Sequence, residues 1–328
     1  MPKQLPRRRF LGTATIAASG FGLLRCSQSA GDGTEEHWED PGFPVVDLHV
    51  HLDNSTIDKV LALPQARRVR FGIVEHAGNK ENKYPVVLSN DTELDQYLLM
   101  LHKKPVYRGV QAEWIDWMTC FSRDSVSKLD FVLSDAMTFP GKDGQRVKLW
   151  EDGALERVGF KDAQEFMDRY VDWHVKVIEL EPIDILANTT WLPAQLADDY
   201  DRLWTEPRME KIITAALKHG VALEINATYK LPRLAFLKLA KDAGVKFSFG
   251  SNGRYPNMGK LDYCIEVARK LKLGRKDIFT PAPDGQKAVQ RRWPSVQGRA
   301  KQTEFKGERW PSVEPELRSP ALDQTHQG

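Results

Sequence analysis

The sequence predicts an α/β fold in which seven parallel strands form a TIM-barrel-like barrel. Short apolar segments alternate along the chain with longer segments of helical periodicity, as is typical of parallel strands joined by helices. Polar residues suited to metal binding or catalysis follow nearly every apolar segment. The carboxyl ends of all strands of a parallel barrel open onto one face, so this distribution favours a barrel over a doubly wound sheet.

Seven segments have the composition of strands. Most are continuous apolar runs, which is the pattern of strands that are buried on both faces. They are residues 45–49, 70–74, 106–112, 131–134, 183–187, 221–225 and 246–249.

Four longer segments carry helical patterns. They are residues 162–180, 207–219, 232–243 and 261–271. In the first, Phe166, Tyr170 and Trp173 recur at helical spacing. Gly220 and Gly244 stand where the second and third helices should end, and each leads directly into a strand.

The polar residues near the strand ends form the candidate site. An open sheet would bring together only the two or three strand ends at its switch point, whereas a barrel brings them all together. They are His49, His51, Glu75, His76, Glu113, Asp135, Asn188, Glu224, Asn226 and Asn252.

The composition restricts the classes of function. The 328 residues are 41% hydrophobic, enough for one large domain, which we place at residues 43–281. Basic and acidic residues number 47 and 45, so nothing indicates general nucleic-acid binding, and no apolar run of 18 residues predicts a membrane span. Cys26, Cys120 and Cys264 lack zinc-site spacing, although the count permits a disulfide between Cys120 and Cys264.

The N-terminus resembles an export signal. Residues 1–30 combine the twin arginines Arg7 and Arg8 with a short apolar run, which predicts a twin-arginine signal and a periplasmic or extracellular protein. A basic tail without a targeting role is the alternative. Arg25 fits a lipobox poorly, which argues against a lipid anchor at Cys26. Residues 31–42 are then a polar linker.

The C-terminal residues 282–328 form a polar tail rich in Pro, Gln, Arg and Lys. The sequence Arg-Trp-Pro-Ser-Val occurs in it twice, at 292–296 and at 309–313. Such a repeated Trp-Pro pair predicts docking, either on the tail's own barrel or on a partner.

The pair His49 and His51 is the sharpest signal for a metal. Histidines at i and i+2 of a strand point the same way, so both rings can reach one ion. His76 ends the next strand and is either a further ligand or a core histidine. Glu113 could bridge ions or act as a base, or could form a salt bridge at the barrel mouth.

These residues carry a resemblance to the PHP family (polymerase and histidinol phosphatase domains) over roughly residues 45–281. It rests on Asp-Leu-His-Val-His at 47–51, Glu-His-Ala-Gly at 75–78, Gly-Val-Ala-Leu-Glu-Ile-Asn at 220–226, and the block at 240–254. The resemblance implies a distorted seven-stranded (βα) barrel and a cluster of up to three divalent metals that hydrolyses phosphoesters.

Several positions depart from the family pattern. Asn252 and Arg254 replace the aspartate and histidine of a closing Ser-Asp-Ala-His, and Met137 and Asn188 stand where histidines are expected. The ligand expected a few residues beyond the histidine pair has only Asp53 as a candidate.

The remaining ligands predict about one divalent ion, either zinc, manganese or magnesium, and a small anionic substrate. As metal ligands we expect His49, His51, His76, Glu113 and Asn252; as catalytic residues His76, Glu113 and Arg254; and as substrate-binding residues Arg254 and Asn226. Arg254 can receive an anion, or can be a surface arginine.

The sequence leaves three hypotheses. The first is an exported, PHP-like metal-dependent hydrolase, a phosphoesterase, with a reduced metal site. The second is a binding protein that keeps the barrel without the chemistry. The third is an amidohydrolase-type enzyme, which lacks the expected lysine and late aspartate at strand ends.

Overall fold

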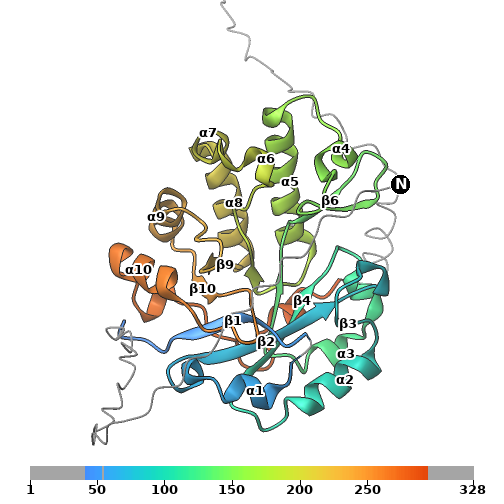
Figure 1. The fold of residues 1–328 in the computed structure, drawn as a ribbon, viewed down its shortest axis with the longest axis vertical. Helices are drawn as coiled ribbons and strands as arrows, with labels where there is room; N and C mark the ends of the chain where they lie inside the picture. Colours follow the sequence, from blue (N-terminus) through green and yellow to red (C-terminus); the bar gives the residue numbers. More distant parts are fainter. Residues whose placement is uncertain (1–40, 54, 295–328) are drawn as a thin grey trace, which may run out of the picture. The chain divides into compact units, whose positions relative to one another are not determined.

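The computed structural model describes residues 41–53 and 55–294 (Figure 1). The expected signal and linker, up to residue 40, lie outside the described residues, as does the second Trp-Pro copy at 309–313. In the described part of the chain, no helix is both long enough and apolar enough to span a membrane.

Seven parallel strands form a closed barrel, which confirms the predicted fold class. Their order around the barrel is β1-β10-β9-β8-β5-β4-β2, and a further pairing between β1 and β2 closes the ring. The strands are β1 (Val46–His51), β2 (Arg70–Ala77), β4 (Tyr107–Ala112), β5 (Phe131–Ser134), β8 (Ile185–Leu186), β9 (Ala222–Asn226) and β10 (Phe247–Gly250). Each lies within two or three residues of its predicted position.

Four short strands lie outside the ring, and the sequence pattern did not reveal them. β3 (Val87–Leu88) pairs with β2, and β11 (Gly253–Arg254) pairs with β1. β6 (Thr138–Pro140) and β7 (Arg146–Lys148) form an antiparallel hairpin between β5 and the long helix that follows. Such short strands contain too few residues to show a periodicity.

The four predicted helices are present as α5 (Ala163–Leu180), α8 (Glu206–His219), α9 (Leu234–Ala243) and α10 (Asp262–Leu271) (Figure 1). The Asp162 side chain accepts hydrogen bonds from the backbone of Gln164 and Glu165, both at 3.0 Å, and so begins α5. Gly220 and Gly244 end α8 and α9 with φ of 67° and 87°, a conformation that favours glycine.

Apart from the ten-residue α2 (Asp91–Met100), the other helices are short. The α-helices are α1 (Ile57–Leu61), α2 (Asp91–Met100), α3 (Arg123–Val126), α4 (Ala154–Val158), α6 (Ala194–Ala197), α7 (Tyr200–Leu203) and α11 (Ala288–Arg291). The 3₁₀ turns are η1 (Pro64–Arg67), η2 (Lys80–Asn82), η3 (Trp117–Cys120) and η4 (Arg275–Asp277).

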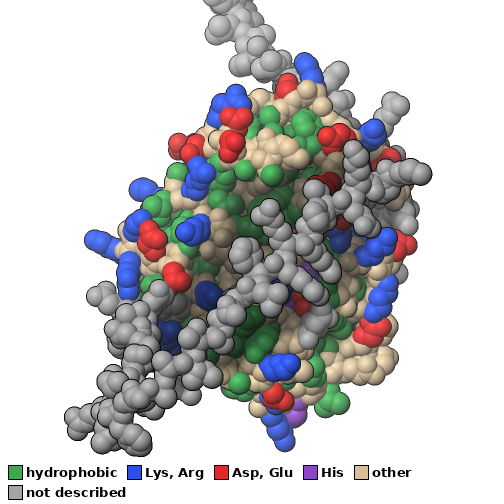
Figure 2. All heavy atoms as spheres, in the orientation of Figure 1, with side chains coloured by type: hydrophobic (Ala, Val, Ile, Leu, Met, Phe, Trp, Pro, Cys, Tyr) green, Lys and Arg blue, Asp and Glu red, His purple; other side chains and the backbone are tan. Residues whose placement is uncertain are grey.

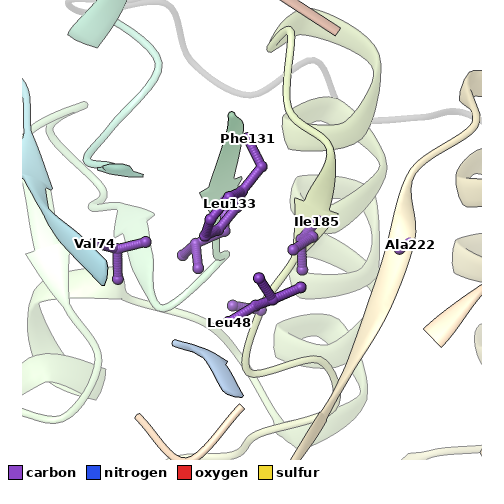
Figure 3. Packing of buried hydrophobic residues seen from close by; sticks show 7 residues of the cluster. Leu48, Val74, Phe131, Leu133, Ile185 and Ala222 are labelled. Carbon is purple, nitrogen blue, oxygen red and sulfur yellow. The ribbon is translucent and has the colours of Figure 1, made fainter. Parts of the chain in front are cut away.

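Apolar side chains fill the barrel below its polar mouth. Leu48, Val74, Leu133 and Ile185 come from four different strands and pack together, with Phe131 beside them (Figure 3). Glycine at position 109 makes room for Phe131, because a Cβ there would lie 2.5 Å from the phenylalanine ring. This packed layer supports the residues of the mouth from beneath.

An irregularity in β1 determines which side chains reach the mouth. Asp47 pairs with Phe71 and Val50 pairs with Ile73, so three residue steps of β1 lie against two of β2. Leu48 therefore joins the apolar core while the adjacent His49 also points into the barrel, where it bonds to residues of other strands. His51, two residues on, shares the direction of His49.

Asp47 fixes this irregular strand end to the loop after β10. Its buried carboxylate accepts hydrogen bonds from the backbone N of His49 at 3.3 Å and of Ser251 at 2.9 Å. It also accepts from the Ser251 hydroxyl at 2.6 Å and from the backbone N of Gly259 at 2.8 Å. These four donors offset part of the cost of burial, although burial still raises the pKa of Asp47.

The first part of the polar tail packs on its own barrel. Ala288 and Val289 are buried, and the Ala288 backbone N donates to Asp184 Oδ1 at 3.2 Å. Trp293 of the first Trp-Pro copy lies edge-on to Trp117, with ring centroids 5.8 Å apart. On the face drawn in Figure 2, basic and acidic side chains of the described residues are interspersed.

The two cysteines of the domain are not joined. Cys120 and Cys264 are both free, and the Cys264 thiol instead donates to the backbone O of Ile225 at 3.1 Å. The disulfide that the residue count permitted is therefore absent from the described residues.

Candidate metal centre at the barrel mouth

The barrel brings the polar strand ends of the sequence together at one mouth. The backbone turns sharply there: Asp53, Trp114, Asn188 and Asn252, which follow β1, β4, β8 and β10, have φ values of 46°, 68°, 51° and 48°. Residues other than glycine adopt this left-handed conformation at an energetic cost, and such residues concentrate at functional sites.

One set of mouth residues is joined by hydrogen bonds, and we call it the His49 network. His49 Nδ1 lies 2.6 Å from Glu224 Oε1, and His49 Nε2 lies 3.0 Å from Gln111 Oε1. Both ring nitrogens of His49 are therefore in use. The network consists of His49, Gln111, Asp135, Asn188, Glu224 and Asn226.

The amides of the network hold its two carboxylates. Asp135 Oδ2 accepts from Gln111 Nε2 at 3.2 Å and from Asn188 Nδ2 at 2.9 Å. Glu224 Oε2 accepts from the Asn188 backbone N at 2.8 Å and from Asn226 Nδ2 at 3.1 Å. Because Gln111 Nε2 must donate to Asp135, its Oε1 faces His49, and His49 must donate to it.

The hydrogen bonds of His49 favour its protonated form. Burial lowers its pKa, but the adjacent Glu224 carboxylate outweighs burial, and the net direction is upward. Burial likewise raises the pKa of Glu224, and the contact with His49 reverses this to a net decrease. An imidazolium that donates from both nitrogens cannot bind a metal, so the expected role of His49 as a ligand is not supported by this geometry.

A second set of residues has ligand atoms without partners, and we call it the open group. It consists of His51, Asp53 and His76, whose potential ligand atoms all lie within 4.8 Å of one another. Within the described residues, hydrogen bonds reach neither ring nitrogen of His51, nor His76 Nε2, nor Asp53 Oδ1. Buried polar atoms without partners cost free energy, which makes their convergence on one point informative.

Both histidines of the open group are held neutral. Burial, followed by the charge of neighbouring groups, lowers the pKa of His51 well below its ordinary value. Burial and the nearby Arg254 lower the pKa of His76 to about 3. Neutral imidazole is the form that binds metals.

His76 is held in place by two neighbours. Its Nδ1 lies 2.7 Å from Glu113 Oε1, and its ring stacks on Tyr84 with centroids 3.6 Å apart. The Tyr84 hydroxyl donates to Glu113 Oε2 at 3.1 Å, and burial raises the pKa of Glu113 to about 8. Glu113 thus orients a ligand from behind, as carboxylates beside metal-binding histidines commonly do, and is not itself in the open group.

Arg254 connects the open group to solvent. Its Nε donates to Asp53 Oδ2 at 2.8 Å, and its Nη1 donates to Asn252 Oδ1 at 2.9 Å. The side chain of Arg254 is 44% exposed. Among the described residues no hydrogen bond uses Nη2, so this nitrogen can receive an anion.

A cavity of ≈ 230 Å³ opens beside these groups. His76 and Arg254 line it, together with Asp135 of the His49 network. Burial raises the pKa of Asp135 to about 6, and this is the carboxyl group that lines the cavity. The other lining residues are Tyr84, Gln111, Met137, Trp150, Asn188, Tyr229 and Asn252.

The structure separates the residues that sequence placed in one site. His51 and His76 meet as expected, and Asp53 joins them. Asn252 lines the cavity but gives its side-chain oxygen to Arg254. Asn226 is fully buried, bonds to Glu224 and Asn188, and accepts from the Tyr229 backbone, so it lies apart from the cavity lining.

Sequence reasoning missed Gln111, Tyr84, Trp150 and Tyr229. Gln111 lies in β4, two residues before Glu113, which directly follows that strand, so the strand period could have identified it. The three aromatic residues lie in loops and in the hairpin region, where no period marks a residue as facing a cavity.

Comparisons with known proteins leave the family open. No protein-family model matches this sequence, and no curated protein matches it. In structure, the chain is similar to a chain in archaeal ribonuclease P with mature tRNA, at 13% identity over 73% of this chain and 99% of that one, with a TM-score of 0.34.

Two further similar structures are aldolases. One is an HpcH/HpaI aldolase/citrate lyase family protein from Burkholderia cenocepacia J2315, at 14% identity over 71% of this chain and 94% of that one, with a TM-score of 0.30. The other is the HpcH/HpaI aldolase from Desulfitobacterium hafniense DCB-2, at 10% identity over 74% and 96%, with a TM-score of 0.31. Likenesses at this level carry no argument about the activity of this chain.

Proposed function

We propose that this protein is a PHP-like hydrolase of small anionic esters, with phosphoesters first, and that it uses a single divalent ion held by His51, Asp53 and His76. The observation that carries the proposal is the convergence of their partnerless ligand atoms at the barrel mouth. Two histidines and one carboxylate are a ligand set found in catalytic zinc sites, and they leave further positions of the ion open.

The bound ion would supply Lewis-acid polarisation of the ester and a lowered pKa of water. The chain's own residues position it: Glu113 orients His76, and Arg254 orients Asp53. Nη2 of Arg254 then binds the anionic group of the substrate, since guanidinium matches phosphate and carboxylate. The positive charge of Arg254 also offsets the negative charge of the ester at the barrel mouth.

Asp135 is the proposed proton acceptor. It lines the cavity, and its pKa of about 6 lies close to neutrality, where a general base works best. Hydrolysis adds water across the ester bond: Asp135 takes a proton from the attacking water as its oxygen bonds to the ester centre. Asp135 then returns this proton to the leaving oxygen as the ester bond breaks, which regenerates the carboxylate. Asp135→Asn should lower kcat by roughly 10²- to 10⁴-fold and leave the metal in place.

Metal analysis of protein purified without chelators tests the proposal. We expect about one zinc, manganese or magnesium ion per chain in the wild type, and none in Asp53→Ala. Activity is then measured on phosphomonoesters, phosphodiesters and lactones with each of these metals added. Three ions per chain, or a metal content that Asp53→Ala leaves unchanged, would contradict the single-ion site.

A second candidate is a binding protein that has kept the barrel and lost the chemistry. The observation in its favour is the His49 network, whose hydrogen bonds occupy the predicted ligand His49 together with carboxylates and amides at the barrel mouth. If the wild type holds no metal and turns over no ester, while anions bind at Arg254, the binding protein is the better description.

A further inference from the structure

Exposed aromatic side chains line the ≈ 230 Å³ cavity into which His76 of the open group faces. Large apolar side chains are ordinarily buried, yet Trp150 and Tyr229 are 43% and 39% exposed, and both line this cavity. They come from separate segments of the chain: Trp150 follows β7, and Tyr229 follows β9. Two half-exposed rings facing one small cavity suggest a ligand that covers them.

The cavity also contains one fixed positive charge. Arg254 lines it from the opposite end of the sequence, and its Nη2 is free of hydrogen bonds to the described residues. Lys148 lies nearby but its ammonium group faces the rings of Tyr84 and Trp150, at 3.8 and 5.6 Å from their centroids. Arg254 is therefore the residue that can bind an anion in this cavity, and Trp150 and Tyr229 are the residues that can bind a ring.

The volume limits the size of the ligand. A cavity of ≈ 230 Å³ equals roughly eight water molecules in the liquid, and lies below the roughly 300–1,000 Å³ of typical drug-sized sites. One six-membered ring with one phosphate-sized anionic group fits this space, whereas two linked rings with several phosphates exceed it.

We propose that the substrate of this cavity carries a single flat ring beside its anionic group, with the ring against Trp150 and Tyr229 and the anion on Arg254. The inference rests on the proposed function in that it concerns the same cavity, and it adds the substrate class to it. Ring faces attract other rings by offset or edge contact, which a saturated ring of the same size reproduces less well.

Three phosphonates separate the contributions of charge, bulk and flatness. Phenylphosphonate, cyclohexylphosphonate and methylphosphonate carry the same anionic group and have no ester bond to hydrolyse. Isothermal titration calorimetry on the full chain, with and without added zinc, measures their binding without any turnover. We expect phenylphosphonate to bind about tenfold more tightly than methylphosphonate, with cyclohexylphosphonate between them.

Single substitutions test whether Trp150 and Tyr229 cause the expected preference for phenylphosphonate. Trp150→Ala and Tyr229→Ala should each remove most of the preference for phenylphosphonate and leave the affinity for methylphosphonate within about twofold. Tyr255→Ala is the matched control, because Tyr255 is a 44% exposed aromatic residue next to Arg254 that does not belong to the cavity lining. It should change neither affinity.

Equal affinities for the phenyl and cyclohexyl ligands would overturn the inference, as would a preference that survives both ring variants or an absence of phenylphosphonate binding. Failure of the proposed hydrolase has a different signature. In that case zinc has no effect and esters are not hydrolysed, while the ring preference persists in the metal-free protein.

Discussion

The two histidines of β1 lie two residues apart and have opposite environments. Both nitrogens of His49 are bonded, and its charge is balanced by Glu224. Neither nitrogen of His51 has a partner among the described residues, and its pKa is lowered well below the ordinary value by burial. The same strand thus presents one histidine that is bonded within a network and one whose ring nitrogens have no partner among the described residues.

The difference shows that residue type and direction do not identify a metal ligand. Gln111 and Glu224 both accept from His49, and the Glu224 carboxylate raises the pKa of His49 against the effect of burial. A ring that donates from both nitrogens has no lone pair to offer a metal ion. In the open group, Glu113 contacts Nδ1 of His76 and Arg254 contacts Oδ2 of Asp53. His76 Nε2 and Asp53 Oδ1 have no partner among the described residues. The two histidines differ in whether their ring nitrogens already have hydrogen-bond partners.

Breaking the His49 network should have the largest effect. His49→Ala leaves Glu224 buried without its charge partner, which typically costs about 3–5 kcal/mol of the free energy of unfolding. Urea unfolding of the metal-free protein measures this cost. His51→Ala is the matched control, and it should cost less because no hydrogen bond is lost.

A double variant tests whether the unpaired charge of Glu224 causes this loss of stability. Glu224→Gln in the His49→Ala background removes the buried carboxylate, so part of the lost stability should return. If His49→Ala and His51→Ala destabilise the protein equally, the distinction between the network and the open group is wrong.

For metal affinity we expect the opposite order: the open group should matter more than the His49 network. His51→Ala removes a ligand, and we expect zinc affinity to fall by more than roughly a hundredfold, since even outer partners of metal ligands are worth about 10- to 100-fold. Glu224→Gln, within the His49 network, should leave zinc affinity within about threefold. Competition with a chelating dye measures both, and a larger loss in Glu224→Gln than in His51→Ala would reverse the assignment.

The sequence predicted the barrel because its strands are short, continuous apolar runs separated by amphipathic helices. The ends of α5, α8 and α9 could also be predicted, since Asp162, Gly220 and Gly244 act locally through the backbone. Polar strand ends predicted the mouth, because all strands of a parallel barrel share one direction.

The roles within the mouth could not be predicted from the sequence. Whether His49 is bonded depends on Gln111, which lies 62 residues away in sequence, and on Glu224, which lies 175 away. The irregular pairing of β1 with β2, which turns both Leu48 and His49 inward, also has no signature in the spacing of residues. Asp53 was only a candidate because its contact, Arg254, comes from the far end of the barrel sequence.

Arg254 should matter more to anions than to the metal. Arg254→Ala removes the charged contact from the cavity, and inorganic phosphate should bind roughly ten- to a hundredfold more weakly, equivalent to about 1.5–3 kcal/mol. Zinc affinity should fall less, because the loss of the contact to Asp53 Oδ2 is partly offset by removal of a positive charge that opposes the metal ion. Calorimetry with phosphate and with zinc separates the two.

Arg254→Lys serves as the control for charge. Lysine keeps the charge without the planar pair of donors, so it should recover part of the phosphate affinity. Phosphate binding that is unchanged in Arg254→Ala would show that Arg254 is a surface arginine with a structural contact to Asp53.

Glu181, for which we expect no effect on metal affinity, tests whether a single partnerless buried atom is enough to mark a site. It caps the end of α5 and is only 1% exposed, and its Oε2 has no partner in the described part of the chain. It belongs to no cluster of three ligand residues there, unlike the open group. We therefore expect Glu181 to bind no metal and to act only on stability.

Its effect on stability should depend on pH. Burial raises the pKa of Glu181 from 4.5 to about 8, so between these values the folded chain holds a proton that the unfolded chain has lost. The contribution of Glu181 to the free energy of unfolding therefore falls as pH rises from 4.5 to 8, by at most on the order of 1 kcal/mol per pH unit. Glu181→Gln does not titrate, so its stability relative to the wild type should increase across this range and then level off.

Urea unfolding of both proteins from pH 5 to pH 9 measures that stability difference, and zinc titration of the variant should match the wild type. An advantage that is constant with pH would mean that Glu181 is compensated in the fold, and a loss of zinc affinity would mean that a single partnerless atom does mark a ligand.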